Sequence, residues 1–354
     1  MYDNDLWFTI LELPYKQKLE LLKIYKNSDE ILYNFKNSDI IKKYKFDMEK
    51  INYIKDMMSK EEIEIVFFND ENYPNILKNY DDMPYGLFYK GNIKKLNELT
   101  YTVAMVGSRK CTQYGKDVTE IISRDLSLNG IGIISGMARG VDTYAHKTCI
   151  ENKGYTCAVL GCGANVIYPK ENKDLYCQII RKGCIISQYK PNTKPMPYNF
   201  PVRNKIISGL SNLILVTEAD VKSGSLITAT AALEQGKDVG AVPGSVFSKM
   251  SRGTNKLIED GAHVIKNADD VYGILNFKKI NFKKIHNNSS YDLMSENQRK
   301  VYNIISDKPV HVDDIKQVLN IDIQELYELL FEMQLKNKIL CLSGSYYVRV
   351  NNYL

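Results

Sequence analysis

The chain has 354 residues, 44% of them hydrophobic and 25% charged, with a formal net charge of +5 at pH 7. This length allows two or three domains and the apolar content is ample for buried cores, whereas the mild positive charge does not identify a partner. No apolar run approaches about 18 residues, no charged-then-apolar leader opens the chain, and the seven cysteines form no CxxC pair, so we expect a cytoplasmic protein that is neither secreted nor membrane-spanning.

The N-terminal ~75 residues predict a small bundle of short helices. Apolar residues recur there at three- and four-residue spacing, and polar turns separate the periodic segments. A strand is expected from Glu64, and the aromatic stretch at 84–91 predicts an extended entry into a main sheet. The expected helical segments are 6–13, 16–25, 28–35, 40–46 and 46–62.

The central part of the chain alternates between short apolar runs and periodic helical segments. The runs are rich in Val and Ile, as is typical of strands that are buried on both faces of a parallel sheet. The alternation predicts an α/β fold with a parallel sheet. The expected strands lie at 102–106, 130–135, 156–160, 184–187, 212–217 and 238–242.

The strand ends carry Gly, Ser and cationic residues, which suit anion binding. Glycine lets backbone approach an anion closely, Ser adds a donor, helix N-termini favour negative charge, and Arg or Lys supplies the countercharge. Because the carboxyl ends of parallel strands share one sheet edge, six such turns predict one anion-binding platform. The turns are Gly107-Ser108-Arg109, Ser135-Gly136 with Arg139, Gly161-Cys162-Gly163, Arg203-Asn204-Lys205, Ser223-Gly224-Ser225 and Pro243-Gly244-Ser245.

A dinucleotide fits this platform poorly. The turn at 107–112 lacks the second and third glycines of G-x-G-x-x-G and places two cations where a pyrophosphate needs bare backbone. The sequence also lacks a P-loop motif, G-x-x-x-x-G-K-[ST]. A sheet edge with several cations and no cofactor turn is therefore interpreted as the site of a polyanion laid across it.

Six blocks of sequence occur in unbroken order over about 170 residues: 106–115, 135–146, 158–169, 200–211, 216–244 and 252–262. Together they resemble the DNA-processing protein A (DprA, also called Smf) family. The resemblance implies an extended Rossmann-like domain that binds single-stranded DNA without catalysis or a cofactor. It further implies protection of incoming DNA, help in loading RecA recombinase during natural transformation, and a homodimer formed through this domain. For the N-terminal helices it implies a sterile-alpha-motif-like (SAM-like) domain, although the match there is loose.

The family's phosphate-binding residues carry over to positions that match its motifs. Two positions depart from the pattern: Lys205 replaces a second Arg, which keeps the charge but loses the bidentate fork, and Gln188 replaces a family acid. The resemblance and the strand-end turns together predict a phosphate pocket made of Gly107, Ser108, Arg109, Ser135, Gly136, Arg139, Lys170, a helix start at Arg203 and Asn204, and Lys205.

Several of these residues have simpler interpretations. Arg139 could pair with Asp142 on the surface, and Lys170 could be an ordinary solvated residue. Glu218 is expected to be structural, holding Arg203 in place within a basic cleft. His146 has only Cys149 at helical spacing, too little for a metal site, so a packed helix residue is expected.

An enzyme of the lysine-decarboxylase-like phosphoribohydrolase type is the alternative function. Such enzymes share a Rossmann-like sheet and cleave a nucleoside monophosphate between base and sugar. They need a catalytic Glu beside a Pro-Gly-Gly-x-Gly-Thr turn. The corresponding turn at 222–228 lacks that pattern, and Glu234 falls two turns into the following helix.

The C-terminal segment predicts a winged helix after a polar, basic linker. Its third helix carries Glu325, Glu328 and Glu332, which repel phosphate, so a protein contact is favoured over duplex binding. The wing residues Tyr346, Tyr347 and Arg349 leave a base or phosphate contact open. The expected domains are 1–75 helical, 76–278 Rossmann-like, 279–292 linker and 293–354 winged helix.

Overall fold

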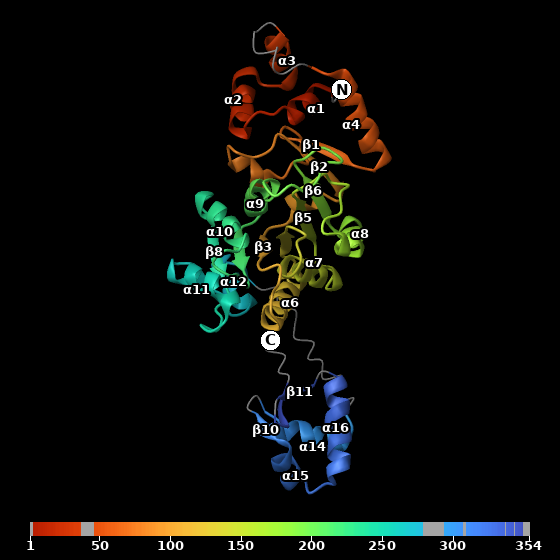
Figure 1. Cartoon of the computed structure of the whole chain (residues 1–354), viewed down its shortest axis with the longest axis vertical. Helices are drawn as coiled ribbons and strands as arrows, with labels where there is room; N and C mark the ends of the chain where they lie inside the picture. The colour runs from red at the N-terminus through yellow and green to blue at the C-terminus, as the bar shows by residue number, and fades with distance from the viewer. Residues whose placement is uncertain are drawn as a thin grey trace. The chain divides into compact units, whose positions relative to one another are not determined.

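The computed structural model of the protein describes residues 3–36, 46–278, 294–306, 309–336, 338–342 and 344–349 (Figure 1). The chain forms two compact units, Met1–Lys278 and Lys279–Leu354. Each unit has its own hydrophobic core, so each is described by itself. No helix among the described residues is long and apolar enough to cross a membrane.

The N-terminal helices pack on one edge of a sheet. Helices α1 (Asp3–Ile10), α2 (Tyr15–Tyr25), α3 (Ser28–Lys36) and α4 (Met48–Lys60) confirm the periodic segments predicted there, whereas 40–45 lies outside the described residues. Their apolar faces share one cluster with strands β1 (Glu64–Phe67) and β2 (Gly86–Gly91). In this cluster Phe8 packs edge-on against Tyr85, with ring centroids 4.9 Å apart, so the helices and the sheet edge form one core.

Within the described residues the main sheet has nine strands in the order β1-β2-β6-β5-β4-β3-β7-β8-β9. Strands β3 through β9 pair in parallel, and β2 and β1 extend the sheet with antiparallel pairs. The six strands predicted from apolar runs are all confirmed, and the parallel core is that of a Rossmann-like fold. They are β3 (Thr102–Val106), β4 (Gly132–Ser135), β5 (Thr156–Leu160), β6 (Cys184–Ser187), β7 (Leu213–Val216) and β8 (Asp238–Ala241), followed by the short β9 (His263–Val264).

Buried helices cover both faces of this sheet, which explains why the strands lack polar alternation. Ala104 and Val106 of β3 face one layer, whereas Val103 and Met105 face the other. The first layer contains α9 (Asn199–Gly209) and α10 (Ser225–Glu234). The second contains α6 (Gln113–Leu128), α7 (Val141–Glu151), α8 (Lys173–Lys182) and α12 (Ala268–Ile274).

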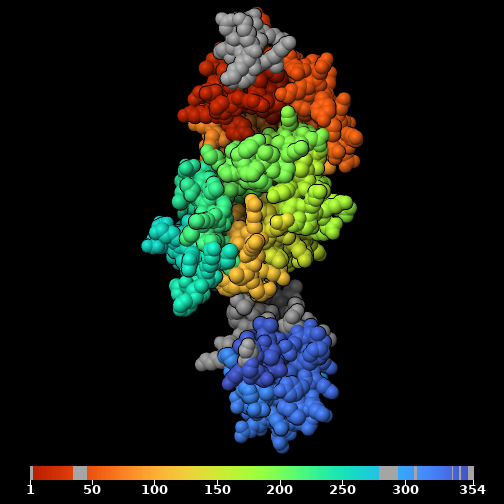
Figure 2. Space-filling model, viewed as in Figure 1, coloured from red at the N-terminus to blue at the C-terminus, as the bar shows by residue number. Residues whose placement is uncertain are grey.

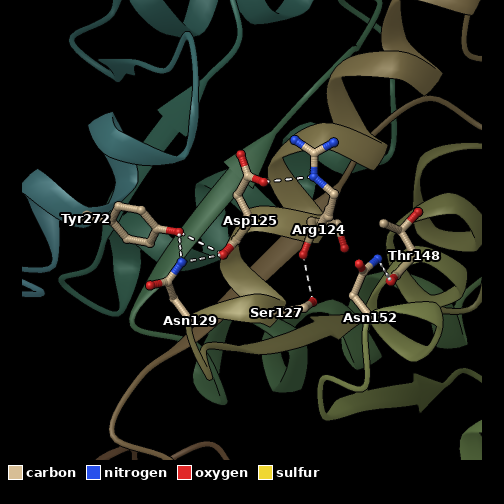
Figure 3. A network of polar contacts seen from close by, with 8 residues as sticks. Arg124, Asp125, Ser127, Asn129, Thr148, Asn152 and Tyr272 are labelled. Carbon is tan, nitrogen blue, oxygen red and sulfur yellow. Dashed lines mark hydrogen bonds and ion pairs between the residues drawn. The ribbon is translucent and has the colours of Figure 1, made fainter. Parts of the chain in front are cut away.

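The C-terminal end of α6 is joined to α12 by a polar network (Figure 3). The Tyr272 hydroxyl donates to the backbone carbonyl of Asp125 at 2.8 Å, and the Asn129 amide donates to the same carbonyl and to the Tyr272 oxygen. The Asp125 carbonyl also accepts from the Asn129 N–H at 3.3 Å, so three donors converge on this carbonyl at the end of α6. The network holds α12 against the second layer.

The direction of chain progression changes at β3. From β3 the chain moves outward through β4, β5 and β6 to one side, and it then returns to place β7, β8 and β9 on the other side. The loops after β3 and β7 therefore diverge to opposite faces of the sheet and leave a crevice between them. In open α/β sheets this switch point is where ligands bind.

The second unit is a winged helix. Helices α14 (Glu296–Ile304), α15 (Val312–Leu319) and α16 (Ile323–Leu335) precede a hairpin of β11 (Ile339–Leu342) and β12 (Tyr346–Arg349), and β10 (Val310–His311) completes the sheet. A capping box at Ser295 begins α14. The predicted arrangement of helices and wing is confirmed.

Two of the three wing side chains proposed for a base or phosphate contact are used inside this unit. Tyr347 is buried in the winged-helix core. Arg349 donates from Nε to the Ile305 carbonyl at 2.9 Å, donates to the Tyr302 carbonyl, and lies over the Tyr302 ring at 4.2 Å. Tyr347 is therefore unavailable for stacking and Arg349 is engaged within the unit, whereas Tyr346 remains exposed.

His146 of α7 is fully buried, which confirms it as a packed helix residue. Its Nδ1 lies 2.6 Å from the Thr156 hydroxyl oxygen. Because that hydroxyl donates its own proton to the Ile133 carbonyl, it accepts a hydrogen bond from Nδ1, which is therefore the protonated ring nitrogen. Burial and the nearby Arg203 charge lower the pKa of His146 to about 3. The imidazole is therefore neutral in the folded protein.

This burial predicts acid sensitivity. The folded pKa lies below the unfolded value near 6.5, so in the window between about pH 6.5 and 3 the unfolded chain binds the proton more tightly. The contribution of the neutral His146 to the free energy of unfolding is complete above this window, and it falls by about 1.4 kcal/mol for each pH unit within it. In urea titrations at a series of pH values, His146→Gln should remove that part of the slope. His263→Gln, which changes a half-exposed histidine, should leave it unchanged.

Candidate functional site

A pocket of about 660 Å³ lies at the sheet's switch point. The loop after β3, the loop after β7 and helix α9 contribute most of its lining, and the surface is hollowed where these gold, teal and green segments meet (Figure 2). Its polar and charged lining residues are Ser108, Arg109, Lys110, Asp142, Tyr168, Arg203, Asn204, Asp220, Lys222, Ser223, Ser225 and Thr228.

The loop after β3 is held rigidly against its neighbours. Ser108 N–H donates to the Glu218 carbonyl at 2.7 Å, and the Ser108 carbonyl accepts from Val141 N–H at 3.2 Å. A side chain at Gly107 would place Cβ 2.6 Å from a methyl group of Val141, so only glycine allows this approach. The loop after β3 is thus fixed against the loop after β7 and the beginning of α7.

Glu218 performs a structural role, although not the expected one. Its two carboxylate oxygens accept from the N–H and the hydroxyl of Thr112, both at 2.7 Å, and Thr112 caps α6 by accepting from Gly115 N–H. The expectation that Glu218 holds Arg203 is wrong. The acid instead ties the loop after β7 to the beginning of α6.

Three exposed cations surround the pocket: Arg109, Lys110 and Lys222. Within the described part of the chain, none of the three has a carboxylate partner at ion-pair distance. The two lining acids are already compensated, because Asp220 pairs with Lys249 and buried Asp142 lies near Arg203. The pocket therefore presents uncompensated positive charge, which suits an anionic ligand.

Arg203 lies under the pocket and is only 4% exposed. One of its terminal nitrogens donates to the Gly136 carbonyl at 2.8 Å and also to the Val159 carbonyl, while Nε donates to the Asn204 side-chain oxygen at 3.2 Å. Burial lowers the pKa of Arg203 to about 10, and the Asp142 carboxylate opposes that shift. Even so, the guanidinium is charged at neutral pH and acts as an internal crosslink between strand ends.

Asp142, Ser135 and Gly136 complete this internal network. Asp142 accepts from the N–H groups of Gly136 and Ala138 at 3.1 and 3.3 Å. Ser135 is fully buried and its hydroxyl donates to the Met105 carbonyl at 2.6 Å. A Cβ on Gly136 would lie 2.6 Å from the Arg203 guanidinium. The predicted turn at Ser135 and Gly136 is therefore engaged with the protein interior and not with the pocket.

The expected helix start at Arg203, Asn204 and Lys205 is wrong. These residues occupy the middle of α9, which begins at Asn199, so their backbone N–H groups belong to the helix and cannot bind an anion. The Phe-Pro pair at 200–201 signals the helix beginning more accurately, because proline is favoured in the first turn. Asn204 still lines the pocket through its side chain.

The remaining predicted cations lie outside the main pocket. Arg139 pairs with Glu171, and not with Asp142 as its simpler interpretation proposed. Lys205 pairs with Asp82, with its Nζ 2.6 Å from a carboxylate oxygen. Lys170 is exposed at the beginning of a short 3-10 helix, Lys170–Asn172. The main pocket thus brings together Gly107, Ser108, Arg109, Arg203 and Asn204 and does not include these three cations, although Arg139 lines a second, smaller pocket with Arg109 and Gly136.

An aromatic rim that sequence reasoning missed lines one side of the pocket. Phe200 lies 5.7 Å from the Tyr168 ring, and the guanidiniums of Arg109 and Arg203 lie 5.5 and 5.7 Å from the Phe200 ring. A Cβ on Gly161 would lie 2.8 Å from this ring, so glycine is required there for close packing. Lys110, one of the two cations noted in the turn at 107–112, and Lys222 were not predicted as phosphate-binding residues, although both line the pocket.

The geometry defines a Rossmann-like domain with a cationic, aromatic-rimmed switch-point pocket, in a chain that also carries a winged helix. Comparison with known families is more specific. Residues 64–276 match the family described as DNA recombination-mediator protein A, and residues 290–345 match the DprA winged helix domain. The chain belongs to the DprA/Smf family of DNA-processing proteins, which confirms the resemblance found in its sequence.

Relatives match over most of the chain. DNA processing protein DprA of Streptococcus pneumoniae is 38% identical over 270 residues, which is 75% of this chain and 95% of the relative. Protein Smf of Escherichia coli is 34% identical over 286 residues, 78% of this chain and 75% of the relative.

Two solved structures have a similar fold. The S. pneumoniae DprA structure aligns with a TM-score of 0.65 at 35% identity, covering 77% of this chain and 95% of that one. The Helicobacter pylori DprA structure, described as giving insight into a single-stranded DNA binding mode, aligns with a TM-score of 0.55 at 31% identity, covering 60% of this chain and 95% of that one.

The placement of Arg203 predicts a large loss of stability on truncation. Arg203→Ala leaves the Gly136 and Val159 carbonyls without this donor and leaves the buried Asp142 charge uncompensated, so unfolding free energy should fall by about 3 kcal/mol or more. Urea denaturation followed by circular dichroism measures this. Arg109→Ala, which removes an exposed side chain, is the matched control and should stay within about 0.5 kcal/mol of the parent. Equal stability of both variants would contradict the internal role of Arg203.

Proposed function

We propose that this protein binds single-stranded DNA without catalysis, through the pocket at the switch point of its sheet. The observation that carries the proposal is the set of exposed, uncompensated cations Arg109, Lys110 and Lys222 on a rigid frame. Phosphates are the ligands that such cations favour, and a pocket open to solvent suits a chain of them. Gly107, Ser108 and Asn204 supply neutral polar groups between the charges.

The preference for single strands rests on the aromatic rim. Phe200 and Tyr168 line the pocket beside the cations, and stacking on aromatic side chains requires bases that are not paired in a duplex. The described DNA-binding mode of the H. pylori relative supports the same choice of ligand. Arg203, in contrast, acts in this proposal by positioning Phe200 and the strand ends beneath the pocket.

The biological role follows from family membership. We propose that the bound strand is incoming DNA, which the protein protects and delivers for RecA loading during natural transformation. A homodimer formed through the Rossmann-like domain is part of the same proposal. Arg139, Lys170 and Lys205 lie outside the main pocket, and in this proposal they contact phosphates further along the strand.

The phosphoribohydrolase alternative is less well supported. It requires a catalytic glutamate at the pocket, but Glu218 is occupied by Thr112 and Glu234 is the last residue of α10. The acids that line the pocket are Asp142, whose negative charge Arg203 compensates, and Asp220, which pairs with Lys249. This arrangement favours binding over hydrolysis.

For the winged helix we propose a protein contact. Its third helix presents Glu325, Glu328 and Glu332, which disfavour phosphate. On the same helix Phe331 and Leu335 are 61% and 70% exposed, a surface more typical of protein recognition than of DNA binding.

Titration of labelled oligonucleotides tests the proposed ligand. Single strands should bind more tightly than duplex. Because about 0.7 counterion is released per phosphate contact, the three pocket cations alone predict a log–log salt slope near −2, and contacts by Arg139, Lys170 and Lys205 would steepen it to about −4. Arg109→Ala should weaken binding at least about tenfold and make the slope shallower by about 0.7. The matched control is Arg181→Ala, which removes an exposed arginine on α8. A slope near zero, equal affinity for duplex, or turnover of a nucleotide would overturn the proposal.

Deletion of residues 290–354 tests the assignment of the winged helix. Because Arg349 and Tyr347 are used internally and the third helix is acidic, single-strand affinity should stay within about threefold of the full chain. The basic linker must be kept, since its lysines add nonspecific attraction. A tenfold or larger loss in a folded, truncated protein would show that this unit contributes to DNA binding.

A further inference from the structure

The loop at 243–251 borders the pocket on the side of β8. It follows β8 directly and ends in a short 3-10 helix, Lys249–Ser251, from which Met250 lines the pocket and contacts the Ser108 hydroxyl at 3.7 Å. Three residues before Met250, Phe247 is 95% exposed, and its neighbour Val246 is 76% exposed. The most exposed aromatic side chain among the described large hydrophobics thus belongs to a loop that forms part of the pocket wall.

This exposure is built into the loop. At its base Asn255 accepts from Gly244 N–H at 3.1 Å and donates to the Gly244 carbonyl at 3.0 Å, and the Tyr114 hydroxyl donates to the Pro243 carbonyl at 2.7 Å. At its tip Ser248 N–H donates to the Ser245 carbonyl at 3.0 Å, which closes a turn around Val246 and Phe247. The loop is anchored on both sides, and the turn holds the ring away from the core.

Two cations, Lys249 and Arg252, follow this ring closely in the chain. Arg252, five residues on, is exposed and has no carboxylate partner at ion-pair distance in the described part of the chain, while Lys249 is 72% exposed although it contacts Asp220 at 3.7 Å. An exposed aromatic ring on a segment that also carries cations is a pattern that proteins use to hold a single strand, with phosphates on the cations and bases on the ring. The ring and its neighbour form too small an apolar patch for a stable protein interface.

We propose that Phe247, supported by Val246, stacks on a nucleobase of the single strand whose phosphates occupy the pocket. The strand would then contact Phe200 and Tyr168 in the pocket and Phe247 on the loop whose Met250 lines it. This inference rests on the proposed single-strand binding and adds a base contact to it. It assigns no base preference, since every base offers a π-face.

Binding of two probes to the full chain tests the assignment. One probe is a labelled oligothymidylate, and the other is a strand of equal length without bases. Phe247→Ala should weaken binding of the oligothymidylate about five- to tenfold and leave binding of the abasic strand within about twofold, because only the stacking contact is lost. Phe247→Leu, which keeps apolar area but removes the ring, should behave like Phe247→Ala. Tyr53→Ala, which removes a 59%-exposed ring from α4, should change neither probe.

The outcomes separate this inference from the proposed function. If Phe247→Ala binds both probes like the parent, the tip contacts no base, and a protein partner becomes the better occupant. If both probes weaken equally, Phe247 acts through the fold or the phosphates, which also overturns the stacking assignment. A parent protein that binds neither probe would instead overturn single-strand binding itself. Thermal melting of each variant shows that the fold is retained.

Discussion

The buried guanidinium of Arg203 is the interaction on which the site depends. It reaches the carbonyls of Gly136, after β4, and Val159, within β5, and it lies near the carboxylate of Asp142 at the beginning of α7. A buried charge without such partners would cost several kcal/mol, so the surrounding backbone must remain in this arrangement. The absence of a side chain at Gly136 follows directly, because any Cβ would occupy the position of the guanidinium. One side chain therefore determines the geometry of two strand ends and of the aromatic ring above it.

Charges at the site divide into two groups with different physical roles. Arg203, Asp142 and Glu218 are buried and compensated by hydrogen bonds, and they fix the frame. Arg109 and Lys222 are exposed and uncompensated, so they are free to neutralise a ligand. Electrostatic binding of a polyanion needs both, because a cation on a mobile loop would lose much of the gain to ordering. The Glu218 contacts with Thr112, which hold the loop after β7 against the end of the loop after β3, provide that rigidity.

The winged helix illustrates how the same residue type can act differently in the two units. Arg349 resembles a phosphate-binding residue in sequence, yet its donors are used by the carbonyls of Ile305 and Tyr302 and its cation lies over the Tyr302 ring. Arg109, also beside an aromatic ring, has no such carbonyl partners among the described residues. Availability of the guanidinium, and not its presence, distinguishes a binding residue from a structural one.

The sequence by itself determined the fold class, the six central strands, most of the N-terminal helices, the winged helix and the family, because hydrophobic periodicity and turn residues act locally. It also identified Gly107, Ser108, Arg109 and Asn204 at the pocket. Tertiary structure alone decided that Arg203 points inward, that Arg139 and Lys205 pair with Glu171 and Asp82, and that Lys110, Lys222 and Phe200 line the pocket. Whether a cation is buried, and which group it pairs with, depends on residues far away along the chain. The local sequence pattern carries no information about which distant residues will lie beside it.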